Sequence, residues 1–221
     1  FSYTAEDGSD KMVEVSSCWM FQTIDTAMKT KEDNNYTVVM TFCITPDNDI
    51  LVCDVARERV PVPKQYKFLI EQRNKHPQVS PQAVEDRASG IGLIQEGRAK
   101  GTPFKPLRAD GDKVRRAMQI ATAYDNGQVY HRTGADWLEE FEKELLFFPN
   151  SVHDDQVDCL AYGGILSLRR SLSRITSPLV LNNAIVPATE PGDISTHSGT
   201  ERMRAYIDEQ RHNMARNSEQ W

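Results

Sequence analysis

The chain has 221 residues, of which 39% are hydrophobic and 26% are charged, and its net charge is −6. This composition is ordinary for a folded protein and excludes the disordered and fibrous classes. No apolar run approaches the roughly 20 residues of a membrane span, and the N-terminus has no signal-peptide pattern, so we expect an intracellular protein without a membrane partner. The four cysteines form no CxxC pair, which argues against a zinc site and a disulfide framework.

The first half of the chain predicts an opening rich in strands. Residues 1–16 are polar and acidic without an apolar period, and we interpret them as a linker remnant. The following pattern predicts strands at residues 18–25, 36–45 and 50–57, which would form an antiparallel meander. A helix is expected at residues 63–75, with Pro63 suited to its first turn.

The second half predicts strands alternating with helices. Strands are expected at residues 78–85, 104–108 and 129–131, and helices at 91–100, 113–124, 135–146 and 154–170. This order predicts an α/β fold: an RNase H-like mixed sheet, with a three-strand antiparallel meander plus parallel strands and helices on both faces. We expect one domain at residues 17–170. Residues 171–221 are interpreted as a C-terminal tail, flexible or partly helical, with one helix candidate at 201–216.

The most specific motif is the segment from His153 to Asp158, in which Asp154, Asp155 and Asp158 precede or begin the last predicted core helix. Residues three and four apart share one side of a helix, so these acids would gather at the helix N-terminus. Capping of the helix explains one acid, through the favourable dipole. Three acids so close together repel one another, which favours a metal site.

Two further acids stand at predicted strand ends. Asp25 ends the first strand and Glu85 ends a strand after the meander; taken singly, Asp25 is better explained by a turn, and Glu85 is explained equally well as the acid of a helix start. Together with the HDDxxD segment they would converge in an RNase H-like sheet into one carboxylate cluster. Such a cluster suits Mg²⁺ or Mn²⁺, and two ions could activate water and stabilise the leaving oxygen in phosphodiester cleavage.

Several segments in order resemble the C-terminal nuclease domain of the large terminase subunits of tailed bacteriophages. These are Ile24-Asp25-Thr26-Ala27 with Asn35-Tyr36-Thr37-Val38, Val84-Glu85-Asp86 with Ser89-Gly90, and Phe147-Phe148-Pro149 leading into His153-Asp154-Asp155-Gln156-Val157-Asp158. The resemblance implies an endonuclease that cuts concatemeric double-stranded viral DNA during genome packaging. It implies that Asp25, Glu85 and Asp155 are catalytic metal ligands and that Asp158 is a further ligand.

The resemblance also implies partners. These are an N-terminal ATPase domain of the same polypeptide, the portal and the small terminase subunit, at the viral procapsid in the host cytoplasm. The sequence leaves open whether Asp86 or Asp154 replaces Glu85 or Asp155. It also leaves open a resolvase-type nuclease and a portal-docking module without catalysis.

Basic residues between Lys100 and Arg116 form either a solvated face or a surface for the DNA backbone. Lys29 and Lys31 follow the first predicted strand and allow the same two interpretations. His153 is expected to support the acids rather than to bind metal. Trp137 and Phe141, at helical spacing, are expected to belong to the core.

Overall fold

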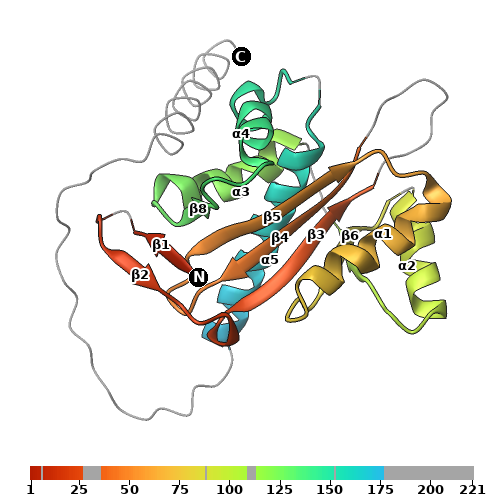
Figure 1. Ribbon diagram of the computed structural model, residues 1–221, viewed down its shortest axis with the longest axis horizontal. Coiled ribbons are helices and arrows are strands. Elements are labelled where there is room, and N and C mark those ends of the chain that lie inside the picture. The colour runs from red at the N-terminus through yellow and green to blue at the C-terminus, as the bar shows by residue number, and fades with distance from the viewer. Residues whose placement is uncertain (6, 27–35, 88, 109–112, 152, 177–221) are drawn as a thin grey trace, which may run out of the picture.

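The computed structural model describes residues 1–5, 7–26, 36–87, 89–108, 113–151 and 153–176 (Figure 1). The strands are β1 (Ser2–Thr4), β2 (Asp10–Met12), β3 (Trp19–Asp25), β4 (Thr37–Ile44), β5 (Ile50–Glu58), β6 (Gln82–Glu85), β7 (Lys105–Leu107) and β8 (Val129–His131). The helices are α1 (Val62–Lys75), α2 (Ser89–Ala99), α3 (Lys113–Asp125), α4 (Leu138–Phe147) and α5 (Asp155–Thr176), with a short 3₁₀ turn at Val15–Ser17.

The central feature is a mixed sheet whose strands lie in the order β7-β6-β3-β4-β5-β8 within the described residues. β3, β4 and β5 pair antiparallel as the expected meander, and β6 and β8 add parallel to β3 and β5. β7 extends the same side in parallel with β6. The predicted α/β mixed sheet of RNase H-like order is therefore confirmed.

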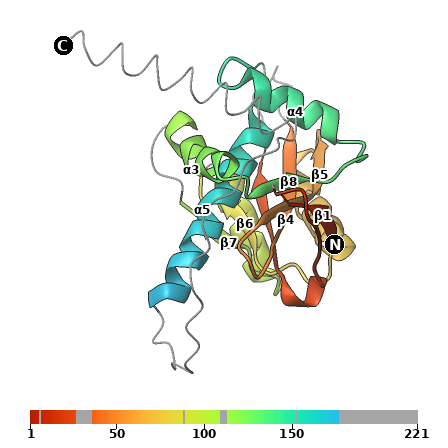
Figure 2. The same ribbon diagram turned by 90° about the vertical axis from the view of Figure 1, so that its left-hand side faces the viewer.

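Helices cover both faces of this sheet, because the central strands are apolar on both sides. In β3, Phe21 packs toward one core, together with residues of α3, α4 and α5, and Ile24 packs toward the other, together with residues of α1 and α2. Figures 1 and 2 show the two layers from perpendicular directions. Every residue of β4 is buried, as expected for a strand covered on both faces.

Helix α5 crosses the sheet in close contact with β3 and β4. Two glycines make this approach possible. A Cβ atom on Gly163 would clash with the outer end of the Phe42 ring, and one on Gly164 would lie 3.0 Å from Ile120 of α3. The Thr23 hydroxyl also donates a hydrogen bond of 2.8 Å to the backbone carbonyl of Cys159. The helix is thus fixed to the strand that ends at Asp25.

Two element boundaries differ from the prediction by four residues or more. β6 begins only at Gln82, because Pro81 has no N–H with which to extend the ladder. Helix α5 continues to Thr176, six residues beyond the predicted end, since the residues after Arg170 contain no helix breaker before that point. The helix candidate at residues 201–216 lies outside the described residues.

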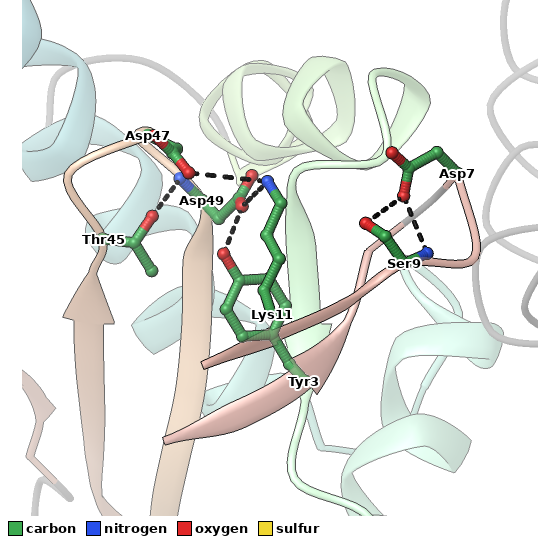
Figure 3. A network of polar contacts seen from close by, with 7 residues as sticks. All are labelled: Tyr3, Asp7, Ser9, Lys11, Thr45, Asp47 and Asp49. Carbon is green, nitrogen blue, oxygen red and sulfur yellow. Dashed lines mark hydrogen bonds and ion pairs between the residues drawn. The ribbon is translucent and has the colours of Figure 1, made fainter. Parts of the chain in front are cut away.

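The first residues form a hairpin that packs against the sheet. β1 and β2 make a hairpin, and Tyr3, Val13 and Val15 pack against a buried cluster at the end of the sheet. The Tyr3 hydroxyl donates to Asp49 at 2.6 Å, and Lys11 forms an ion pair with the same carboxylate at 3.4 Å (Figure 3). The apolar residues that anchor this hairpin are too few to give a sequence period.

No helix in the ranges that the structure describes has the length and apolar character needed to cross a membrane.

Candidate metal centre

Strand register places Asp25 beside Glu85. β3 and β6 are parallel neighbours in which Ile24 pairs with Val84, so the next residue of each strand lies at the same carboxyl edge. Side chains alternate along a strand, so Glu85 points to the face covered by α5 and Asp86 points to the opposite face. Asp86 forms an ion pair with Arg108 at 3.5 Å instead. Of these two neighbouring acids, Glu85 is the one that faces Asp25.

The first turn of α5 brings two more carboxylates to this edge. Asp155 and Asp158 lie there, and both raise the pKa of Asp25 by their negative charge. Asp155 accepts a hydrogen bond from the backbone N–H of Tyr36, which lies just before β4. The predicted residues Asp25, Glu85, Asp155 and Asp158 therefore come together from two strands and one helix.

The electrostatics of Asp25 show how crowded this edge is. Desolvation is the largest cause of its pKa lying well above the usual range, followed by the charges of Asp158, Asp155 and Glu85. The Lys113 ammonium acts in the opposite direction. Desolvation and the neighbouring charge of Asp154 also raise the pKa of Asp155. A cluster with this excess of negative charge needs cations to keep all its carboxylates ionised.

Two basic residues of α3 supply part of that positive charge. Lys113 contacts Asp154 at 2.6 Å and Asp158 at 3.1 Å. The nearly buried Arg116 donates to the other carboxylate oxygen of Asp158 at 2.7 Å. Asp154 is thus engaged with Lys113, while Asp155 is the member of that pair that acts on Asp25.

The donor set suits a hard divalent cation, because all four predicted ligands are carboxylates and Asp25 is crowded by like charges. In the described part of the chain, however, no three His, Cys, Asp or Glu side chains are close enough to hold one ion as they stand. Lys113 and Arg116 hold both oxygens of Asp158, which accounts for part of this spacing. Binding of metal would require these side chains to rearrange.

Comparison with known proteins agrees with this arrangement. Residues 22–164 match the family model of the Terminase RNaseH-like domain, which is well over half of the chain. The chain belongs to this family. No curated protein sequence matches it significantly.

Solved structures of large terminase nucleases have the same fold as this family member. The large terminase nuclease of thermophilic phage G20c with bound zinc is 18% identical, with a TM-score of 0.53, over 67% of this chain and 81% of that chain. Its magnesium-bound structure is 16% identical, with the same TM-score and the same coverages. The terminase nuclease domain of human cytomegalovirus is 11% identical, with a TM-score of 0.51, over 66% of this chain and 82% of that chain.

Sequence reasoning missed Tyr162, although it lies one helical turn after Asp158. Its hydroxyl is hydrogen-bonded to the Glu85 side chain, and its pKa is raised by burial and then by Asp158, Glu85 and Asp25. The i, i+4 spacing from Asp158 was the signal that could have identified it. Tyr162 links the acid on β6 to the helix that carries the other acids.

Sequence reasoning also missed Glu144 on α4. This buried carboxylate accepts hydrogen bonds from the backbone N–H of Gln156 at 2.7 Å, from the Gln156 side chain at 2.6 Å, and from the Val157 N–H at 3.3 Å. It therefore satisfies free N–H groups at the start of α5. An acid among the apolar residues of an amphipathic helix was the signal in the sequence that could have identified Glu144 as a buried carboxylate.

The remaining predicted residues have more ordinary surroundings. His153 packs edge-on against the Tyr36 ring at 5.3 Å. Phe141 is fully buried and Trp137 packs against it, which confirms their place in the core. In the basic stretch, Lys100 pairs with Glu96, and Lys113 and Arg116 serve the acid cluster rather than an open face. Lys29 and Lys31 lie outside the described residues.

Proposed function

We propose that this domain is a metal-dependent endonuclease that hydrolyses phosphodiester bonds of double-stranded DNA. Its substrate would be concatemeric viral DNA during genome packaging. The observation that carries this proposal is the crowding of Asp25 by Glu85, Asp155 and Asp158 at one sheet edge in a member of the terminase family. A docking module without catalysis has no need for four converging carboxylates, which cost stability.

In this mechanism Asp25, Glu85, Asp155 and Asp158 would hold the metal, as a pair of Mg²⁺ or Mn²⁺ ions. Metal held there would supply Lewis acidity for the attacking water and for the leaving oxygen. Tyr162 orients Glu85 through its hydroxyl. Glu144 fixes the start of α5, and Lys113 and Arg116 hold Asp158 between them, so the protein holds this end of the helix in place, and the carboxylates would complete their arrangement when metal binds.

The family likewise supports a set of partners for this activity. We propose that an N-terminal ATPase domain of the same polypeptide moves the DNA that this domain cuts. The portal and the small terminase subunit would complete the assembly at the procapsid in the host cytoplasm. Membership of the family is what supports each of these partners.

The decisive experiment incubates the domain with supercoiled plasmid in Mg²⁺, Mn²⁺ or EDTA. Asp25→Asn is the test variant, and Asp136→Asn is the matched control, because Asp136 is exposed and precedes α4, away from the acid cluster. We expect nicking and linearisation that require metal, disappear in Asp25→Asn and persist in Asp136→Asn. Full activity of Asp25→Asn, or equal cleavage in EDTA, would reject the proposal.

A further inference from the structure

A second feature lies at the β7 edge of the sheet, outside the carboxylate cluster. It is an open cavity of about 610 Å³ between α2, the end of β7 and the distal half of α5. Its lining includes Asp86 and three arginines, Arg98, Arg108 and Arg169. We call this cavity the β7 groove.

The β7 groove carries positive charge that the protein itself does not neutralise. Arg98 and Arg169 are exposed and have no ion-pair partner within the described ranges. The Arg108 side chain is 84% exposed and meets Asp86 only at 3.5 Å. Three guanidinium groups thus face one carboxylate, in a chain whose net charge is −6. By contrast, Lys113 and Arg116 beside the carboxylate cluster are paired with Asp154 and Asp158.

The groove begins next to the carboxylate cluster. Asp86, which lines it, directly follows Glu85 in the chain. Arg108 directly follows Leu107, the β7 residue that pairs with Glu85 in the sheet. Arg98 on α2 and Arg169 on α5 extend the positive surface away from this edge. Because Asp86 and Glu85 point to opposite faces at this edge, a DNA duplex passing around the edge would contact both the groove and the acids.

We infer that the β7 groove binds the sugar-phosphate backbone of the DNA that the acid cluster cuts, an inference that rests on the proposed function. Guanidinium groups bind phosphate through paired hydrogen bonds, and arginines on three separate elements suit a chain of phosphates better than one anion. The cluster itself repels DNA, since its acids outnumber its bases. Positive charge beside it offsets that repulsion and holds a strand near the acids.

The test compares Arg98→Gln/Arg169→Gln with the wild-type protein. Both side chains are exposed and unpaired in the described structure, so the variant keeps the fold, which thermal unfolding checks. Arg132→Gln is the matched control, because Arg132 is also exposed but follows β8 at the opposite edge of the sheet. Binding of a short fluorescein-labelled DNA duplex is measured by anisotropy in Ca²⁺ over a series of salt concentrations.

We expect the double variant to bind about tenfold more weakly or worse, and Arg132→Gln to bind as the wild type does. The slope of log affinity against log salt should fall by about 2, since each lost phosphate contact removes about 0.9. Unchanged affinity and an unchanged slope would overturn the inference that the groove binds DNA. The same result is expected if the occupant of the groove is an acidic protein segment, and it would overturn the inference in that case too.

Plasmid cleavage in Mn²⁺, measured in parallel, separates this outcome from failure of the proposed function. If the wild type cuts plasmid and the double variant still binds DNA normally, only the groove is rejected. A wild type that neither binds nor cuts DNA rejects both proposals.

Discussion

Replacing Glu144 with alanine should destabilise the protein by about 3 kcal/mol. The change leaves the N–H groups of Gln156 and Val157 and the Gln156 amide without their acceptor. A buried donor left unpaired costs about 1–3 kcal/mol, and loss of a helix cap costs about 0.5–2 kcal/mol. Desolvation raises the pKa of Glu144, so removing the carboxylate returns part of this cost.

Urea and thermal unfolding of the metal-free protein measure this effect. A loss of about 3 kcal/mol corresponds to a fall in Tm of about 6–12 °C for a chain of this size. Glu140→Ala is the matched control, because Glu140 contacts the same Arg57 as Glu144 but is largely exposed, and it should cost about 1 kcal/mol or less. Glu144→Gln keeps one acceptor and should fall between the two.

The cap also has a functional consequence that can be measured. Because Glu144 holds the turn that carries Asp155, Glu144→Ala should weaken Mn²⁺ binding in calorimetry even where the protein remains folded. Equal destabilisation by Glu144→Ala and Glu140→Ala, with unchanged Mn²⁺ affinity, would refute the reasoning.

Three further predictions concern the acids and the glycines. The raised pKa of Asp25 adds stability below about pH 4, and this stability is lost as pH rises through the pKa of the folded state. Asp25→Asn should therefore stabilise the metal-free protein against unfolding at pH 7, and this gain should vanish in acid. A pH-independent effect would contradict it. Mn²⁺ at about 100 times its Kd should stabilise the wild type by about 2.7 kcal/mol, and Asp25→Asn much less, in thermal unfolding. Gly163→Ala should lower the free energy of unfolding in urea by about 1–3 kcal/mol, because its Cβ meets Phe42. Gly92→Ala, which has open space around it, should not destabilise the protein. Similar values for the two variants would contradict this prediction.

Much of the fold could be predicted because the strands and helices have clear periods. The mostly apolar, β-branched β4 and the alternation after α1 were sufficient for the mixed sheet. The hairpin at the N-terminus was not predictable, since Tyr3 and Lys11 are anchored by Asp49, far along the chain. Contacts between distant residues leave no local pattern.

The candidate site was likewise predictable in part. The acids themselves are visible in the sequence, but the choice between Glu85 and Asp86 depends on the register of β6 against β3. The assignment of metal ligands stays a prediction until metal binding is measured. Supporting residues such as Glu144 and Tyr162 escaped notice because hydrogen bonds across the core determine their roles.

The glycine contact of α5 with the sheet has a mechanical consequence. Gly163 lies eight residues after Asp155, about 12 Å along the helix axis. A bulkier side chain there would lift the middle of a rigid rod away from Phe42, and the displacement would be carried to the end of the rod, where the acids are. Substitutions at this distant crossing point are therefore a means of tuning how tightly the carboxylates converge, without altering any of them.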